Sequence, residues 1–284
     1  MLVSCLGDLL LDVIVDAPQG LVPDDDTPAA ITLAAGGQAA NVATWARAYG
    51  ASARLFGPRA ASASGQVVAD ALGRVGVELH GPTTERGGTV MSLVSGGARS
   101  MASDPPAGAW LDEVRPGAWL DGADWLFVSG YALLRAGKPE LLVDLAGAAR
   151  AAGTRIAVDL ASASMITTFG AAAFRDLWQG MRPAVVLANE AEWQATHSAR
   201  SGGPVSWAGT GGTSLLVLKR GPRGCTFVID GVADHREALD TTVRDPTGAG
   251  DALAAGYLLG GVDLAMRAAA RCVAQVGAQW RGPA

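Results

Sequence analysis

Short apolar runs alternate with longer amphipathic segments through the middle of the chain. The run 125–129 is typical of a buried strand, and residues 139–152 after it have the period of a helix that Gly153 ends. The same pattern predicts strands at 155–159, 184–188 and 214–219, helices near 169–178 and 190–196, and two final helices at about 249–259 and 264–276. Strands that alternate with helices at this spacing form parallel βαβ units. We therefore expect an α/β fold with a doubly wound, mostly parallel sheet.

Two stretches, 12–33 and 77–104, break this alternation because neither has a helical period. Both contain short strand-like runs separated by Pro, Asp and Gly turns. We predict that they form one small antiparallel sheet inserted into a single domain that spans residues 1–284. Such a sheet beside the crevice at the strand ends would act as a lid over a ligand, and the alternative is an ordinary edge hairpin.

Composition narrows the class of partner. The 284 residues carry a formal net charge of −5 and no run of Lys or Arg, so we expect no nucleic-acid partner. The longest uncharged run, 27–46, contains Pro and several polar residues, and the N-terminus lacks a basic segment, so neither a membrane span nor a signal peptide is expected. Three widely spaced cysteines and three isolated histidines indicate a reducing cytoplasm and no metal cluster.

The segment Asp245-Pro-Thr247-Gly248-Ala249-Gly250-Asp251 precedes an apolar helix. Three small residues at a helix start let backbone N–H groups approach an anion, and the helix N-terminus favours negative charge there. A carboxylate beside a bound phosphate would weaken its binding, but it could take a proton from a hydroxyl that attacks the phosphorus. The alternative is a turn that Asp251 caps. Neither a P-loop nor a dinucleotide fingerprint occurs in the chain.

Other polar segments lie at predicted element ends. Gly36 and Gly37 precede a helix that carries Asn41, and they would let a ligand approach, or they form a simple turn. Asn189 and Glu192 share one face of a helix start and could hold the waters of Mg²⁺. Lys219 lies in a turn that also contains Gly221 and Gly224, where it could meet a phosphate.

Taken together, these segments resemble the ribokinase-like (PfkB) carbohydrate kinase family over essentially the whole chain. The segment at 245–251 is similar to its C-terminal signature, Gly-Gly-Gln-Ala-Ala-Asn at 36–41 to its N-terminal signature, and Asn189 to Glu192 to its N-x-x-E motif. Arg99-Ser100-Met101 resembles a lid strand of the family. The resemblance implies transfer of the ATP γ-phosphoryl group to a hydroxyl of a sugar or related compound.

The resemblance also implies a role for each matching residue. Asp251 would be the general base, with Gly248, Ala249 and Gly250 as the anion hole. Acceptor hydroxyls would be held by Asp12, Gly36, Gly37, Asn41 and Arg99. Asn189 and Glu192 would act through Mg²⁺ and its waters, and Lys219, Gly221 and Gly224 would line the nucleotide side. Asp245 and Thr247 would lie at a loop for a monovalent cation such as K⁺.

Some positions depart from the family pattern. Gln38 stands where ribokinases have lysine, and residues 159–162 lack the Asn and Arg of fructokinase-type members. These departures leave the acceptor open between a small sugar and a nucleoside of the adenosine type. A non-catalytic sugar-binding regulator is the alternative outside the enzymes. Because lid sheets have edge strands that pair between subunits, a homodimer through the lid is a further expectation.

Overall fold

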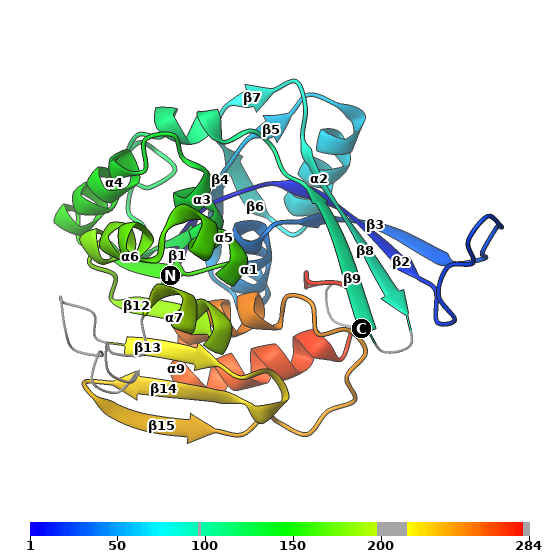
Figure 1. The fold of residues 1–284 in the computed structure, drawn as a ribbon. Coiled ribbons are helices and arrows are strands. Elements are labelled where there is room, and N and C mark those ends of the chain that lie inside the picture. The colour runs from blue at the N-terminus through cyan, green and yellow to red at the C-terminus, as the bar shows by residue number, and fades with distance from the viewer. Residues whose placement is uncertain (96–97, 198–214, 281–284) are drawn as a thin grey trace.

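A computed structural model describes residues 1–95, 98–197 and 215–280 (Figure 1). Its main element is a nine-stranded sheet in the order β15-β14-β13-β12-β11-β10-β1-β4-β6. These strands are β1 (Leu2–Leu6), β4 (Ser52–Phe56), β6 (Val77–His80), β10 (Trp125–Ser129), β11 (Arg155–Asp159), β12 (Val185–Asn189), β13 (Leu215–Lys219), β14 (Cys225–Ile229) and β15 (Val232–Arg236). All neighbours from β13 to β6 pair in parallel, whereas β14 and β15 pair antiparallel. The doubly wound, mostly parallel sheet predicted from the sequence is confirmed.

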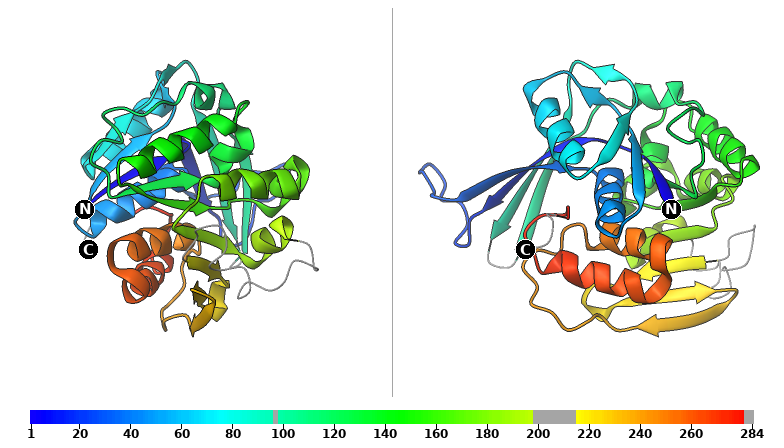
Figure 2. Two further views of the ribbon diagram at one scale, coloured as in Figure 1. Left: turned by 90° about the vertical axis from the view of Figure 1, so that its left-hand side faces the viewer. Right: turned by 180° about the vertical axis from the view of Figure 1, so that it is seen from behind.

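Helices cover both faces of this sheet, as its apolar strands require. One core lies between the sheet and α1 (Gln38–Ala48), α2 (Ala63–Arg74) and α9 (Ala249–Val273). The other lies under α3 (Gly130–Arg135), α4 (Glu140–Ala151), α5 (Ala163–Phe169), α6 (Ala171–Gly180) and α7 (Glu190–Thr196). Short 3₁₀ turns occupy Gly108–Glu113 and Gly221–Arg223. The two layers of helices are seen on either side of the sheet in Figure 2.

A second sheet projects from this body (Figures 1 and 2). It has the order β3-β2-β8-β9, built from β2 (Leu10–Asp16), β3 (Ala30–Gly36), β8 (Gly88–Ser95) and β9 (Ala98–Asp104). Its central pair, β2 and β8, is parallel, so the sheet is mixed and the expectation of a purely antiparallel sheet is wrong. Between β3 and β8 the chain passes through α1, β4, β5, α2, β6 and β7, so β8 is not joined to β2 by a hairpin and can run parallel to it.

The stretch expected to supply this second sheet, 77–104, is divided between three sheets. Residues Val77–His80 form β6, which pairs in parallel with β4 of the large sheet. A two-stranded pair joins β5 (Arg59–Ala60) to β7 (Thr83–Thr84). Only residues from Gly88 onward belong to the second sheet. The reason is α2, which the sequence analysis did not identify: it forms a β4-α2-β6 crossover and buries Val77 to 4% exposure.

Most other predicted elements agree with the structure. The strands at 125–129 and 155–159 and the helix at 190–196 have the predicted bounds. The helix expected near 169–178 is α6, which begins and ends two residues later, and α5 before it was not predicted; Gly170, with φ of 107°, separates the two helices. Ser214, the predicted first residue of β13, lies outside the described residues.

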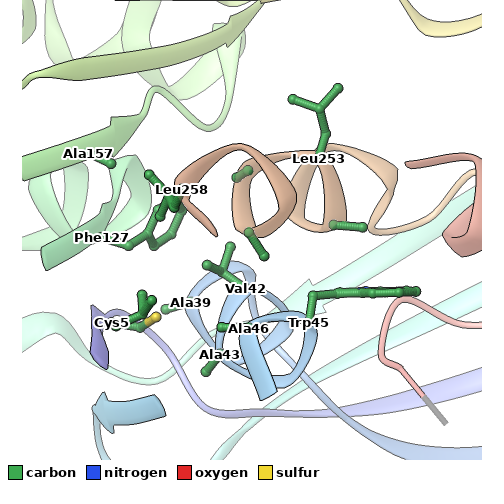
Figure 3. Packing of buried hydrophobic residues seen from close by; sticks show 14 of the residues in the cluster. Cys5, Ala39, Val42, Ala43, Trp45, Ala46, Phe127, Ala157, Leu253 and Leu258 are labelled. Carbon is green, nitrogen blue, oxygen red and sulfur yellow. The ribbon is translucent and has the colours of Figure 1, made fainter. Parts of the chain in front are cut away.

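The helix α9 is two packed helical segments. Gly260 and Gly261 have non-helical dihedral angles and separate the halves, in agreement with the two predicted final helices. The first half packs on α1 in the core, where Val42 points toward α9, whereas Leu253 points away from α1 (Figure 3). By length and composition α9 alone of the described helices could cross a membrane, but half of its apolar window is buried in the protein.

Gly256 allows the two halves of α9 to meet. A Cβ atom built there would lie 2.7 Å from the Leu264 carbonyl oxygen and 2.8 Å from the Ala265 Cα. We therefore expect Gly256→Ala to lower the free energy of unfolding by about 1–3 kcal/mol through overpacking. Exposed Gly73 in α2 has nothing within 4 Å of such a Cβ, so Gly73→Ala should raise it by about 0.4–1 kcal/mol.

Urea denaturation of both variants measures these changes. Opposite signs for two Gly→Ala substitutions within helices are expected, because only one of the sites lacks room. A stable Gly256→Ala protein would contradict the described contact between the halves of α9.

Candidate active site

The candidate residues converge at the carboxyl ends of the large sheet's strands, near the N-terminus of α9. Asp159 ends β11, Asn189 ends β12 and Lys219 ends β13, and these strands are neighbours in the order β13-β12-β11. Asn41 from α1 contacts Asp251 from α9. In open α/β sheets, ligands bind at this end of the strands. The topology thus brings together side chains that lie more than 200 residues apart.

The loop before α9 is fixed by the buried carboxylate of Asp245. Its Oδ1 accepts hydrogen bonds from the Thr247 backbone N–H (2.9 Å) and hydroxyl (2.5 Å), and its Oδ2 accepts from the Gly277 N–H (2.8 Å). Gly248 then adopts a left-handed conformation with φ of 76°, and a Cβ there would lie 2.5 Å from Ala278 Cβ. These contacts hold the backbone N–H groups of the predicted anion hole at the start of α9. The cation role of Asp245 and Thr247 stays a prediction.

Asp251 lies in the first turn of α9, where its Oδ2 accepts a 2.8 Å hydrogen bond from Asn41 Nδ2. The pKa of Asp251 is raised to about 7. Burial is the main cause, the nearby Asp159 and Asp12 carboxylates add to the rise, and Asn41 and Lys219 oppose it. A carboxyl group with a pKa near neutrality can both accept and release a proton at physiological pH. The arrangement therefore suits a general base.

Asn41 links this carboxylate to the remainder of α1. The residue is only 6% exposed, and its amide nitrogen is engaged by Asp251. Its Oδ1 is buried and has no hydrogen-bond partner among the described residues. Since a buried acceptor without a partner is costly, this oxygen is free to accept a hydrogen bond, as the predicted acceptor-binding role requires. Asn41 can thus orient Asp251 and bind an acceptor, and only the second role was predicted.

Gly36 and Gly37 make room for the protein's own atoms. A Cβ at Gly36 would lie 2.1 Å from Asp12 Oδ1, and one at Gly37, with φ of 101°, would lie 2.3 Å from the Asp8 carbonyl oxygen. The sequence interpretation placed a ligand in this space, but Asp12 and Asp8 occupy it. The two glycines therefore position Asp12 on β2, next to the start of α1.

Asp12 and Arg99 belong to the second sheet. Burial raises the pKa of Asp12 to about 6, with Arg99 nearby as an opposing charge and Asp245 adding to the rise. The Arg99 Nε donates a 2.7 Å hydrogen bond to the buried Ser92 Oγ, which fixes the guanidinium on the sheet. Both predicted acceptor-binding charges therefore lie on the same sheet, and Asp12 is close enough to Asp251 to raise its pKa.

Asn189 and Glu192 form a capping box at the start of α7. The Asn189 N–H donates to Glu192 Oε2 (2.7 Å), Asn189 Nδ2 donates to Oε1 (2.7 Å), and the Glu192 N–H donates to Asn189 Oδ1 (2.8 Å). Glu192 is 6% exposed, and burial raises its pKa to about 7, with Asp159 adding to the rise and Lys219 opposing it. The pair thus has a structural role that the sequence analysis did not weigh.

The same oxygens also fit a magnesium ion held through water. Carboxylate and amide oxygens are hard ligands, and a carboxylate keeps lone pairs beyond the two that Asn189 uses. Among the described residues no group of three or more His, Cys, Asp and Glu side chains could hold a metal directly. A Mg²⁺ ion that keeps most of its own waters needs no such group.

An apolar cavity of about 600 Å³ lies between this site and the edge of the large sheet. Its walls come from α9, the turn after β13 and the segment before α9. The lining includes predicted site residues: Asn189, Lys219, Gly221, Gly224, Ala249 and Gly250. Apolar side chains such as Leu253, Met266 and Val273 also line it. A volume of this size with polar groups at one end is typical of a small-molecule site.

The sequence analysis missed one member of the site. Asp159 is fully buried, and both of its carboxylate oxygens accept hydrogen bonds from Lys219 Nζ, at 2.8 and 2.7 Å. The available signal was its place as the last residue of a predicted buried strand, where charge is rare. A second buried ion pair joins Asp8, which follows β1, to Arg135 at the end of α3.

Several solved structures have the same fold. A probable sugar kinase from Rhizobium etli is similar at 20% identity with a TM-score of 0.84, covering 99% of this chain and 95% of its own. The adenosine kinase from Sinorhizobium meliloti is similar at 20% identity with a TM-score of 0.81, and the match covers 99% of this chain and 96% of that one. An uncharacterized sugar kinase from Pyrococcus horikoshii in complex with ATP is similar at 20% identity with a TM-score of 0.76, and the match covers 97% of this chain and 93% of that one.

At these identities the solved structures establish the fold, including the inserted sheet. The sequence also identifies the family, because the pfkB family carbohydrate kinase profile matches residues 1–280. The match runs from β1 past the end of α9 and so includes every element that supplies a residue to the site. This protein belongs to the pfkB family of carbohydrate kinases.

Proposed function

We propose that the protein is an ATP-dependent kinase that transfers the γ-phosphoryl group to a hydroxyl of a small carbohydrate, with Asp251 as general base. The observation that carries this proposal is the position of Asp251. It lies at the N-terminus of α9, is held by Asn41, and follows directly after Gly250, which lines the apolar cavity. Its raised pKa and its place beside an anion site match the needs of hydroxyl activation.

The residues divide the reaction between them. Asp251 accepts the proton of the acceptor hydroxyl as its oxygen forms a bond to the γ-phosphorus. The bond from that phosphorus to the β–γ bridging oxygen breaks, and its electron pair leaves with ADP. The backbone N–H groups of Gly248, Ala249 and Gly250 stabilise negative charge on the transferring group at the start of α9. Asp12, Asn41 and Arg99 bind the acceptor on the other side, and Gly36 and Gly37 leave the room that Asp12 needs there.

The apolar cavity is the proposed nucleotide side. Lys219, Gly221 and Gly224 line it near its polar end, and the apolar wall of α9 suits a base. Asn189 and Glu192 would hold Mg²⁺ through its waters, and this ion neutralises phosphate charge when bound. Asp245 and Thr247 would support a monovalent cation such as K⁺ next to the anion hole.

An alternative acceptor is a nucleoside. The similarity to an adenosine kinase, at 20% identity, gives it support equal to that from the sugar kinases. A sugar is favoured by the polar side chains of the acceptor region, where Asp12, Asn41 and Arg99 offer partners for several hydroxyls. A purified-enzyme panel of sugars and nucleosides with ATP, read by ADP release, decides between them. A non-catalytic regulator is disfavoured because Asp251 and its contacts are intact.

The second sheet is the proposed lid, and it offers a route to a homodimer. Its outer strands β3 and β9 are edges that pair with no other strand among the described residues. The three cysteines are buried and free, which is compatible with the proposed cytoplasmic location. Sedimentation of the protein with and without acceptor tests the assembly.

Asp251→Asn should lower kcat by about 10²–10⁴ while leaving KM for ATP and acceptor nearly unchanged. The amide keeps the shape and still accepts the hydrogen bond from Asn41, but it cannot take a proton. Steady-state kinetics on the folded variant measures the change. A kcat above a tenth of the unmodified enzyme's would contradict the base assignment.

The pH dependence follows from the raised pKa of Asp251. A base acts when deprotonated, so turnover should fall as the pH drops through about 7. Between about pH 4 and 7 the folded state holds a proton that the unfolded state releases, so this group makes stability fall as the pH rises.

Asp251→Asn removes that dependence. Relative to the unmodified protein, it should be stabilised by about 2–3 kcal/mol more at pH 8 than at pH 5. Thermal unfolding at the two pH values measures this. A gain that is larger at pH 5 would show that the pKa of Asp251 is not raised.

Asp12→Ala should raise KM for the acceptor about 10- to 100-fold, because a charge-assisted hydrogen bond is lost, and leave ATP affinity unchanged. Asn41→Ala should lower kcat as well, since Asn41 also donates to Asp251. Steady-state kinetics measures acceptor KM and kcat for both variants, and calorimetry measures their affinity for ATP. Equal losses of ATP and acceptor affinity in Asp12→Ala would overturn the division of the site.

A further inference from the structure

A buried ion pair crosses the site above the end of β12. The Lys219 ammonium donates to both Asp159 oxygens, at 2.8 and 2.7 Å, although β11 and β13 are separated by β12 in the sheet. Asp159 is fully buried, whereas the Lys219 side chain is 16% exposed and lines the apolar cavity. An ammonium has three donors, so two are engaged by Asp159 and one remains for a ligand in the cavity.

The position of the ammonium is unfavourable for a cation by itself. A Cβ at Gly250 would lie 3.3 Å from Lys219 Nζ, so the lysine packs against the first turn of α9. This is the positive end of the helix, which repels a cation. Burial lowers the pKa of Lys219, and the carboxylates of Asp159 and Glu192 raise it by more, so that the net shift is upward. The anion behind the lysine is therefore what keeps a charge in this place.

We propose that Asp159 is a positioning residue of the phosphoryl transfer, acting through Lys219, which it holds against Gly250 so that the remaining donor meets the terminal phosphate of ATP. This inference rests on the proposed function. The Lys219 ammonium stabilises the charge that develops on the transferring group, and its fixed place needs no reorganisation during the reaction. Asp159 touches no reactant, and its effect passes entirely through the lysine.

A purely structural clamp between β11 and β13 is the competing explanation. A clamp would affect stability and leave the choice between nucleotides unchanged. The proposal instead requires that the pair distinguish ATP from ADP, because only ATP carries the γ-phosphate. The ratio of ATP affinity to ADP affinity is thus a readout that a structural role does not move.

The experiment compares Lys219→Met, Asp159→Asn and the double variant by calorimetry with ATP and with ADP, both with Mg²⁺. Each single variant should lower the ATP-to-ADP affinity ratio by about 10- to 100-fold. The double variant should lose no more than Lys219→Met does, since Asp159 acts only through the lysine. Removing both charges also avoids an unpaired buried charge, so the double variant keeps the test open if a single variant does not fold.

Leu142→Ala in α4 is the matched control, because it removes a fully buried side chain from the opposite core layer without touching the site. It should lose stability and keep the nucleotide ratio and kcat. An unchanged ratio in Lys219→Met would overturn the contact with the terminal phosphate. An unchanged ratio in Asp159→Asn alone, or additive losses in the double variant, would overturn the role of Asp159. Absence of ATP binding by the unmodified protein would instead contradict the proposed function itself.

Discussion

The packing of α1 against the first half of α9 is the contact on which the site depends. It brings a helix that follows the second sheet next to a helix near the end of the chain, and buried Val42 and Trp45 lie within this core (Figure 3). The hydrogen bond from Asn41 to Asp251 lies at the same junction. Because the apolar contact fixes both backbones, one amide suffices to orient the carboxylate.

Around this junction the protein collects acidic groups that repel one another. Lys219 supplies the opposing charge for Asp159, Glu192 and Asp251, and Arg99 supplies it for Asp12. Such a cluster is costly in an empty protein and becomes less so when cations accompany the nucleotide. Perturbed pKa values of this kind gather at functional sites, and here they coincide with the family's signature segments. The electrostatics and the sequence motifs thus point to the same place by separate routes.

The sequence allowed prediction of the parts that local patterns determine. Strands such as 125–129 and 155–159 are apolar runs between turns, and the segment at 245–251 carries its own chemistry. Contacts between distant segments could not be predicted in this way. The pairing of Asp159 with Lys219 depends on which strands are neighbours, and the use of Gly36 as room for Asp12 depends on the strand register. The helix α2 was missed because its alternation of small and polar residues gives only a narrow apolar face, with Val68 and Leu72 buried.

The separation of the second sheet from the large one has an evolutionary consequence. Asp12 and Arg99 stand on strands that leave the body after β1 and return before α1, or leave after β7 and return before the 3₁₀ turn at Gly108–Glu113. On the proposed division of the site, substitutions within these two segments of the chain would change the acceptor side and leave Asn189 and Lys219 in place. Asp12 also acts electrostatically on Asp251, so a change at Asp12 would shift the pKa of the proposed base. A new acceptor preference would therefore arise in the two segments and in the environment of Asp251 together.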